Sequence, residues 1–413
     1  MEITKNELNK IGPIPQGWDV IKLGKIGEFK NGINKDKDQF GFGFPFVNLN
    51  DVFNFTTDSK NLSLVNSTTN EQKEYSLKEG DVLFIRSSVK PSGVGLTCVI
   101  EKDLENTVYS GFIIRYRSNG ELEKEFKKHC FNEFGFRKWL IAKSTISANT
   151  NINQTALKSL ILKLPPKPEQ QKIGAILSTW DQAIEKTQQL IEQLKLRKKG
   201  LMQELLAGKK RLPGFDGEWK EYNLGDITKR ITTKNEELDD TVVTISAQRG
   251  FVRQEEFFKK RVASSTLSGY YLIEKGDFAY NKSYSNGYPM GAFKRLDDFD
   301  KAVVTTLYIC FSIKENADSD FLLKYFEGGL LVRNIRRIAQ EGGRAHGLLN
   351  IGISDFFNLR LTLPPKDEQI AIARVLNSID EEIKLHQKKL RQLKNQKKGL
   401  MQELLTGKKR VKI

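Results

Sequence analysis

The apolar positions of residues 168–206 follow a seven-residue repeat. Large apolar side chains recur there at alternating spacings of four and three residues, the pattern of a helix that buries one stripe against another helix. Proline falls only at the start of the segment, at Pro168, and Gly208 stands where a glycine often ends a helix. At about 1.5 Å per residue, the predicted helix is roughly 55–60 Å long. Its apolar stripe comprises Ile173, Leu177, Trp180, Ile184, Ile191, Leu194, Leu201 and Leu205, and is interrupted by Thr187 and Lys198.

The same segment returns near the C-terminus at a constant offset of 199 residues. Leu164–Lys167 recurs as Leu363–Lys366, and Lys198–Leu206 recurs unchanged as Lys397–Leu405. Two helices with one shared stripe most simply pack on each other, and a pseudo-two-fold axis across them makes them antiparallel. The second stripe comprises Ile372, Leu376, Ile379, Ile383, Leu390, Leu393, Leu400 and Leu404, and is interrupted by His386 and Lys397.

The regions before the two helices mix strand and helix patterns. Strand-like apolar runs lie at Asp81–Ile85, Gly111–Tyr116 and Val303–Ile309, and helical patterns cover residues 122–142 and 319–338. The sequence therefore predicts an α+β protein in which two mixed α/β domains are separated by two long helices that form an antiparallel coiled coil, with a pseudo-two-fold internal repeat. The expected segments are 1–164 for the first domain, 165–211 for the first helix, 212–363 for the second domain and 364–413 for the second helix.

Composition limits the setting in which the chain works. No apolar run is long enough to cross a membrane, and the first residues lack the pattern of a signal peptide, so a cytoplasmic protein is expected. The three cysteines, Cys98, Cys130 and Cys310, lie far apart and are odd in number, which favours reduced thiols over disulfides. The three histidines and these cysteines fit no standard zinc spacing, so no metal site is expected.

The charge of the chain favours a polyanionic partner. The formal net charge is +16, and an excess of that size is typical of proteins that bind nucleic acid. Much of the excess lies in the helical repeats, because residues 169–211 carry nine basic and five acidic residues and residues 368–410 carry eleven and five. Two interpretations stay open: the helices pass near DNA, or their basic faces meet partner subunits.

The repeated motifs resemble those of one known family. Leu-Pro-Pro-x-x-Glu-Gln opens each helical repeat, Leu-Leu-x-Gly-Lys-Lys-Arg closes it, and residues 275–287 read Lys-Gly-Asp-Phe-Ala-Tyr-Asn-Lys-Ser-Tyr-Ser-Asn-Gly. With these motifs, and with its order of domain, helix, domain, helix, the chain resembles the specificity subunits of type I restriction–modification enzymes over essentially its whole length.

The resemblance implies a function for each part. Each recognition domain would read one half of a split, asymmetric target in double-stranded DNA. The striped helices would set the spacing between the halves and dock two methyltransferase subunits, and motor-nuclease subunits would complete the restriction enzyme. S-adenosylmethionine, ATP and Mg²⁺ would then belong to the partner subunits, and this chain would carry no cofactor.

Candidate DNA-contacting residues lie on polar loops, because base edges and phosphates are read by Arg, Lys, Asn, Gln, Ser and Thr. The main loop of each domain follows a Gly-Asp pair and an apolar strand, after Gly80-Asp81 in one domain and after Gly276-Asp277 in the other. The alternative is that these are ordinary solvated loops. The candidates are Arg86, Ser87, Ser88, Lys90, Asn149, Asn151, Gln248, Arg249, Asn281, Lys282, Ser283, Tyr284, Asn286, Arg344 and His346.

The sequence favours a binding protein over an enzyme. The two Pro-Pro pairs lack the Asn/Asp and Tyr/Phe of a methyltransferase motif, no GxxxxGK[ST] is present, and Phe40–Phe44 is expected to be a loop without cofactor-loop spacing. We therefore expect no catalysis in this chain. Two other interpretations remain: the specificity subunit of a related fused nuclease–methylase system, and a coiled-coil scaffold that binds no DNA.

Overall fold

The structure of the protein is a computed structural model that describes residues 3–4, 7–8, 11–53, 62–258, 263, 266–341 and 349–413. The chain forms two compact units. Unit 1 consists of Met1–Gln188 and Lys388–Ile413, and unit 2 consists of Gln189–Gln387. Each long helix is shared between the units, so the units cut across the four segments that the sequence suggests.

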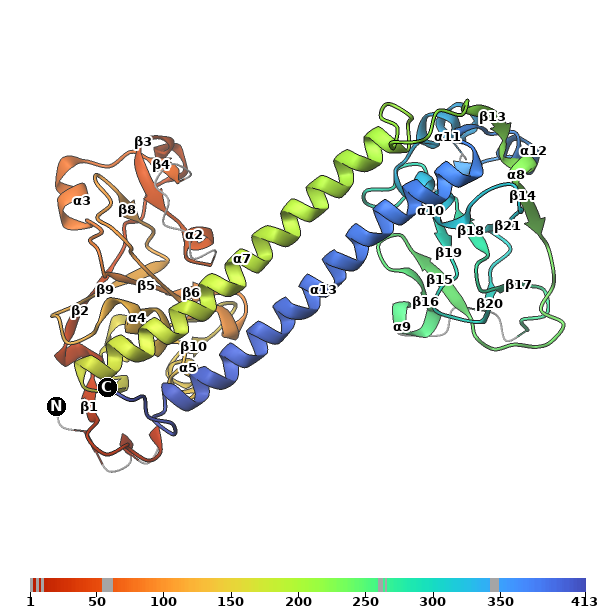
Figure 1. The fold of residues 1–413 in the computed structure, drawn as a ribbon. Helices are drawn as coiled ribbons and strands as arrows, with labels where there is room; N and C mark the ends of the chain where they lie inside the picture. Colours follow the sequence, from red (N-terminus) through yellow and green to blue (C-terminus); the bar gives the residue numbers. More distant parts are fainter. Residues whose placement is uncertain are drawn as a thin grey trace. The chain divides into compact units, whose positions relative to one another are not determined.

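The two long helices are α7 (Lys167–Leu205) and α13 (Lys366–Leu404), each 39 residues long (Figure 1). Each ends just before a glycine with positive φ, Gly208 at 65° and Gly407 at 68°. This backbone conformation suits glycine because it has no Cβ to clash. The predicted long helices and their ends are confirmed.

Ion pairs fix the direction of the helices within each unit. In unit 1, Asp181 of α7 accepts a hydrogen bond from Lys397 of α13. A second pair joins Glu169, nearer the start of α7, to Arg410, which follows the end of α13. There the Arg410 Nε donates to the Glu169 Oε1 over 2.7 Å. Numbering rises along α7 as it falls along α13, so the two helices are antiparallel there. The repeat-related pairs in unit 2 have the same sense: Lys198 with Asp380 and Arg211 with Glu368.

Unit 1 is built around a four-stranded antiparallel sheet in the order β2-β9-β5-β7. Its strands are β2 (Gly27–Asn31), β9 (Ile113–Ser118), β5 (Val82–Ile85) and β7 (Thr97–Val99). Smaller sheets join β1 (Asp19–Lys22) to β12 (Ile161–Leu164); β4 (Ser63–Val65), β3 (Phe40–Val47) and β8 (Val108–Tyr109); and β10 (Thr145–Ile146), β11 (Thr150–Asn151) and β6 (Ser87–Ser88). The helices are η1 (Leu23–Lys25), η2 (Lys37–Gln39), α2 (Leu49–Phe53), α3 (Thr69–Glu74), η4 (Pro91–Gly93), α4 (Lys124–Cys130), α5 (Phe134–Ala142) and α6 (Gln154–Lys158).

Unit 2 repeats this plan with the sheet order β14-β21-β18-β19. The strands are β14 (Thr228–Ile231), β21 (Ile309–Ile313), β18 (Phe278–Asn281) and β19 (Ala292–Arg295). Two-stranded pairs are β13 (Lys220–Asn223) with β24 (Arg360–Leu363), β15 (Val243–Ser246) with β16 (Gly250–Arg253), β17 (Tyr271–Glu274) with β20 (Lys301–Val304), and β22 (Gln340–Glu341) with β23 (Leu349–Asn350). The helices are α8 (Leu224–Ile227), α9 (Gln254–Phe258), α10 (Ser319–Glu327), α11 (Val332–Ile338) and α12 (Ile353–Phe357).

Strand register relates the two sheets residue by residue. Val82 of β5 lies opposite Tyr116 of β9, and Phe278 of β18 lies opposite Phe311 of β21. By this register, the offset is 196 residues between β5 and β18 and 195 between β9 and β21. The weak sequence likeness around the two Gly-Asp pairs therefore reflects a shared sheet, and the predicted internal repeat holds for the domains as well as the helices.

Aromatic and aliphatic side chains fill the core of each unit, and the long helices take part in both cores. Ile173 and Leu177 of α7 and Leu404 of α13 are buried with Trp18 and Phe131 in unit 1. In unit 2 the corresponding cluster comprises Leu205, Leu206, Phe278, Phe311, Phe356, Ile372 and Leu376. Each pair of helix segments is therefore packed into its domain and not only against the other helix. No helix in the described part of the chain is both long enough and apolar enough to cross a membrane.

Four local expectations were wrong. The helical patterns at 122–142 and 319–338 each break into two helices, α4 with α5 and α10 with α11. Glu133 supplies one reason, since its carboxylate accepts hydrogen bonds from the N–H groups of Gly135 and Phe136 and so caps a new helix. The run Val303–Ile309 is interrupted by a turn, and Phe40–Phe44 belongs to strand β3, which carries a register shift between Phe40 and Phe44.

Candidate nucleic-acid interface

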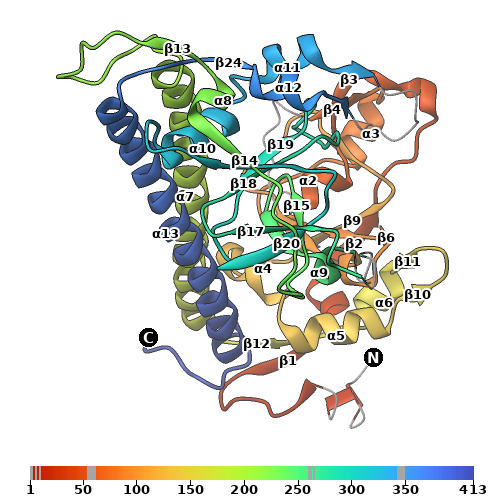
Figure 2. The same cartoon turned by 90° about the vertical axis from the view of Figure 1, so that its right-hand side faces the viewer.

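The structure brings the candidate loops of unit 1 together although they lie far apart in sequence. Strand β6 pairs with β11, so that Ser87 lies opposite Asn151 and Ser88 lies opposite Thr150. The Ile152 N–H also donates to the Arg86 carbonyl over 2.9 Å. A polar edge therefore forms from two segments, and Figure 2 shows β6 and β11 on the side of the unit away from α7.

The remaining candidates of unit 1 flank this edge. Lys90 is exposed and precedes the short helix η4. Asn149 is exposed at the tip between β10 and β11, and its carbonyl accepts hydrogen bonds from the Ser147 hydroxyl and the Asn151 amide, each over 3.1 Å. These bonds hold the tip while the Asn149 side chain projects into solvent.

Arg86 has a structural partner as well as an exposed part. Its Nη1 donates to the Gly111 carbonyl over 3.1 Å, and its backbone N–H donates to the Phe112 carbonyl over 2.8 Å. Arg86 is half-buried, so its guanidinium both braces the neighbouring turn and keeps donors at the surface.

The candidates of unit 2 form a second cluster at the equivalent end of its sheet. Asn281 ends β18, and its Oδ1 accepts from the Ser283 N–H over 3.0 Å. The Gln248 Nε2 donates to the Asn286 carbonyl over 3.1 Å, which joins the β15–β16 turn to the loop after β18. Beside them lie exposed Arg249, half-buried Lys282 and exposed Tyr284. Arg344 and His346 lie outside the described residues.

Most residues of the apolar stripe on the long helices are buried within the chain. Of the stripe residues proposed for spacing and partner binding, eight are buried in the units: Ile173, Leu177, Leu194, Leu205, Leu376, Ile379, Ile383 and Leu404. The other five are half-buried: Trp180, Ile184, Leu201, Leu393 and Leu400. The stripe therefore packs the helices within the units.

The ion pairs at the helices are electrostatically distinct in the two units. Burial works to raise the carboxyl pKa of Asp380, but hydrogen bonds from Lys198 and Lys324 outweigh it and lower the pKa. At the repeat-related place in unit 1, His129 lies 3.7 Å from Asp181. Burial, reinforced by the charge of Lys397, lowers the pKa of His129 to about 4. The imidazole is therefore neutral near pH 7.

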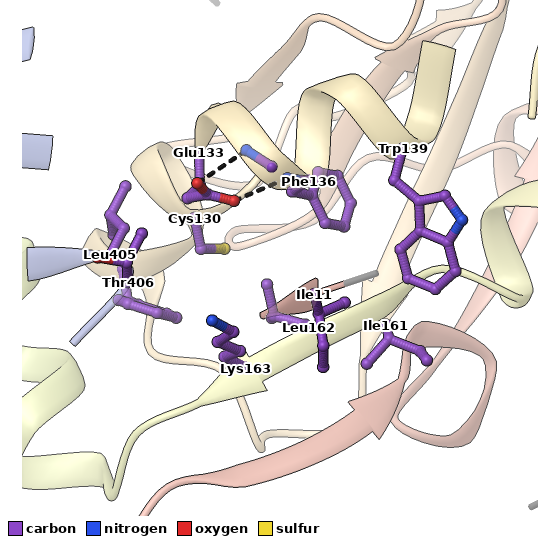
Figure 3. Close-up of a pocket in the computed structure, with 12 residues that line it drawn as sticks. Ile11, Cys130, Glu133, Phe136, Trp139, Ile161, Leu162, Lys163, Leu405 and Thr406 are labelled. Carbon is purple, nitrogen blue, oxygen red and sulfur yellow. Dashed lines mark hydrogen bonds between the residues drawn. The ribbon is translucent and has the colours of Figure 1, made fainter. Parts of the chain in front are cut away.

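A cavity of about 70 Å³ lies in unit 1 between α5, β12 and the residues after α13 (Figure 3). Its charged groups already have partners, because the Glu133 carboxylate caps α5 and the Lys163 Nζ donates to the Pro13 carbonyl over 2.8 Å. Burial raises the pKa of the Cys130 thiol at its wall well above the ordinary value, which keeps the sulfur protonated and unreactive. The described residues contain no cluster of His, Cys, Asp and Glu suited to a metal ion.

Sequence reasoning missed one residue beside each loop cluster. Phe112 and Leu307 are 55% and 57% exposed, and each stands on a tight turn just before the second strand of its sheet. The sequence placed both in strands, because each adjoins a long apolar run. The available signal was the hydroxyl residue two positions earlier, Ser110 or Thr305, which favours a turn.

The two units share one architecture, and each has a polar loop cluster at the same end of its sheet. This arrangement is that of a binding protein built from an internal repeat. The chain belongs to the family described as type I restriction modification DNA specificity domain, whose model matches residues 15–196 and again residues 216–395. Such a chain is the DNA-recognition subunit of a type I restriction–modification complex and not its catalytic part.

Individual relatives cover nearly the whole chain. The putative type I restriction enzyme MjaX specificity subunit of Methanocaldococcus jannaschii is 28% identical over 98% of this chain and 96% of its own length. The type I restriction–modification S subunit from M. genitalium has a similar fold, with a TM-score of 0.56 at 13% identity over 96% of this chain and 98% of that chain. The HsdS subunit from Thermoanaerobacter tengcongensis also has a similar fold, with a TM-score of 0.50 at 16% identity. The match covers 96% of this chain and 99% of that chain.

Proposed function

We propose that the chain reads a split, asymmetric target in double-stranded DNA, one half with each recognition domain. Residues 1–164 and 212–363 would be the readers, and the helical segments 165–211 and 364–413 would set the gap between the half-sites. The observation that carries the proposal is the shared sheet with a polar loop cluster at the same end in both units. Two equivalent domains that bind one duplex in opposite orientations would present the same edge to opposite strands.

Different loop residues on one scaffold explain why the half-sites would differ. After equivalent strands, one loop reads Arg86-Ser-Ser-Val-Lys and the other reads Lys282-Ser-Tyr-Ser-Asn. Arg suits bidentate contact with guanine, whereas Lys, Tyr and Asn offer other donors and stacking. The two clusters therefore do not present the same chemistry to the bases.

The outward faces of the helices suit subunits that bring the catalytic activities. Leu196 on α7 and Leu385 on α13 are 71% and 67% exposed among basic neighbours. We propose that two methyltransferase subunits dock on these faces and that restriction subunits join through the complex. S-adenosylmethionine, ATP and Mg²⁺ would be bound by those partners, and the complex would work in the cytoplasm. The basic faces would also stand close enough to DNA to add phosphate attraction.

Binding of DNA by the assembled chain tests the proposal. Methylation sequencing of DNA modified by the chain with its methyltransferase subunits should return one motif with two unlike halves. In gel shifts on that motif, Lys282→Ala and Arg86→Ala should each weaken binding about tenfold or more, because one specific contact is worth about 1–3 kcal/mol. The matched controls are the exposed Lys275→Ala in unit 2 and Lys102→Ala in unit 1, which should bind as the parent does.

The outcomes separate the alternatives. Failure of the assembled complex to bind any DNA would leave the coiled-coil scaffold as the better interpretation. Binding that both variants leave unchanged would contradict the loop assignment. Methylation and cleavage from a single fused partner chain would identify the related fused nuclease–methylase system.

A further inference from the structure

The two units contain the same tight turn at the same place in their sheets. In unit 1 the Ile113 N–H donates to the Ser110 carbonyl over 2.8 Å, and in unit 2 the Tyr308 N–H donates to the Thr305 carbonyl over 3.2 Å. The hydroxyl that begins each turn also accepts a backbone hydrogen bond two residues on. The Phe112 N–H donates to the Ser110 Oγ over 3.2 Å, and the Leu307 N–H donates to the Thr305 Oγ1 over 3.3 Å.

Strand register shows that these turns correspond. Phe84 lies opposite Ile114, and Tyr280 lies opposite Ile309. Two steps further in the same registers, the position opposite Arg86 is Phe112 and the position that corresponds in unit 2, opposite Lys282, is Leu307. For the first pair a hydrogen bond from the Arg86 N–H to the Phe112 carbonyl shows the contact directly. In unit 1 the turn therefore places a large apolar side chain next to the basic residue of the candidate DNA loop, and continuing the strand register of unit 2 gives Leu307 the same place beside Lys282.

Both turns are anchored to the protein by buried neighbours and hydrogen bonds. The residue after the apolar one is buried in each case: Ile113 in the core of unit 1, and Tyr308, whose hydroxyl lies 3.0 Å from that of Thr244, in unit 2. In unit 1 the Arg86 Nη1 also binds the Gly111 carbonyl. The turn hydrogen bonds are satisfied inside the protein, so what each turn offers to a partner is the exposed side chain of Phe112 or Leu307.

We propose that Phe112 and Leu307 are apolar wedges that enter the base stack of double-stranded DNA at equivalent steps of the two half-sites. The inference rests on the proposed DNA-reading function. Phe and Leu are both side chains that proteins insert between base pairs to unstack and bend a duplex. A hydrogen-bonded turn suits that task because the base stack resists insertion, and the flanking Arg86 and Lys282 can neutralise the phosphates that the bend draws closer. Contact with a thymine methyl would need no insertion and is the competing outcome.

Local unstacking can be measured with 2-aminopurine, whose fluorescence rises when it leaves the stack. The probe is placed in turn at each permissive step of the methylation motif, in a complex of the full chain with its methyltransferase subunits. We expect a bright step in each half-site. Phe112→Ala should extinguish only the step in the half read by unit 1, Leu307→Ala only the other, and each should weaken binding about tenfold.

Matched variants separate the wedge from general damage to the surface. Phe134→Ala removes a phenylalanine of unit 1 that is more exposed, and Leu238→Ala removes an exposed leucine of unit 2, and both should leave every bright step unchanged. The exchanges Phe112→Leu and Leu307→Phe should retain the signal because each keeps a large apolar side chain. Thermal melting of every variant shows that the fold is retained.

Several outcomes would overturn the wedge. A signal that persists in both alanine variants would come from base extrusion by the methyltransferase partners. Loss of affinity on replacing thymine by uracil, without any bright step, would identify methyl contact instead. In both cases the parent complex still binds its motif, so the proposed DNA-reading function stands while the wedge fails. A parent complex that binds no DNA would instead remove the proposed function itself.

Discussion

The places where the long helices meet the domains differ between the two units, although the charged residues that make the contacts, a glutamate, an aspartate, a lysine and an arginine, are repeated. Glu169 in unit 1 and Glu368 in unit 2 are both buried and both accept paired hydrogen bonds from an arginine, Arg410 or Arg211. Glu169 also accepts from the Trp18 Nε1 over 2.9 Å. The repeat-related indole nitrogen in unit 2, that of Trp219, is buried without a hydrogen-bond partner among the described residues.

The second difference involves the carboxylates in the middle of the helices. Asp380 binds Lys198 and also Lys324 of α10. Asp181 binds Lys397, and α4 brings the neutral His129 near it in place of a second lysine. The contact between the two helices, an aspartate with a lysine, is therefore the same in both units. The contact of that aspartate with the domain differs, because α10 supplies a lysine and α4 supplies a histidine. The two junctions should therefore respond differently to equivalent perturbations.

Removal of the buried glutamates should have the largest effect and should be unequal. Glu169→Ala leaves the buried Trp18 N–H without its acceptor and also removes a partner of the exposed Arg410, and should cost about 1–3 kcal/mol, mainly through the indole. Glu368→Ala removes a partner of the partly exposed Arg211 alone, which keeps its bond to the Gly217 carbonyl, so it should cost less than Glu169→Ala. Hydrogen exchange of the amides in β5 and β9, compared with β18 and β21, reports the opening free energy of each unit. Equal losses in the two units would show that the indole contact contributes nothing.

Acid should weaken unit 1 before unit 2. The folded pKa of His129, about 4, lies below the unfolded value near 6.5, so its neutral form stabilises the fold fully above pH 6.5. That stability is lost as the pH falls from about 6.5 towards 4 and amounts to about 2–3 kcal/mol. In unit 2 the folded pKa of Asp380 lies below its ordinary value of 3.8. The stability that this carboxylate contributes is therefore lost only when the pH falls below about 3.8.

Hydrogen exchange at pH 7 and pH 4.5, corrected for the intrinsic exchange rate, measures the acid effect in each unit. His129→Gln keeps a polar neutral side chain and should abolish the extra acid sensitivity of unit 1. Equal acid sensitivity in the two units, or no change with the glutamine, would mean that the histidine does not control it.

The smallest effect should come from the tryptophans. Trp18→Phe removes a buried hydrogen bond to a carboxylate and should cost about 1–2 kcal/mol. Trp219→Phe removes an N–H that has no partner among the described residues, so it should be close to neutral. Urea unfolding of the two variants, followed by hydrogen exchange, gives both values. A large loss at Trp219 would point to a bound water or another acceptor.

The long helices could be predicted from the sequence because their apolar repeat is regular and occurs twice. The α+β class and the internal repeat followed from the same matches. The break between α4 and α5 could not be predicted, because the local pattern stays helical and the capping carboxylate of Glu133 matters only once the chain turns. The unlike junctions at Asp181 and Asp380 depend on residues more than fifty positions away, which no local pattern records.

The candidate site was predicted in part. The Gly-Asp pairs led to the loops after β5 and β18, and the structure shows that segments distant in sequence, such as β11, lie beside them. The exposed positions of Phe112 and Leu307 were missed, because an apolar residue that adjoins an apolar strand in the sequence usually belongs to that strand. Only the hydrogen bonds of the hydroxyl-capped turn separate them from the strand.

The residues after the two long helices have one further consequence. Gly407 packs against Pro15 and Trp18, and the Arg410 Nη1 donates to the Gln16 carbonyl over 2.6 Å, so residues 407–410 lie on residues 15–18. In unit 2 the corresponding place, from Gly208 to Trp219, is a continuous linker. The two units therefore do not depend on where the polypeptide is interrupted. A circular permutant that links residue 413 to residue 1 and begins and ends at residues 212–214 should form the same two units.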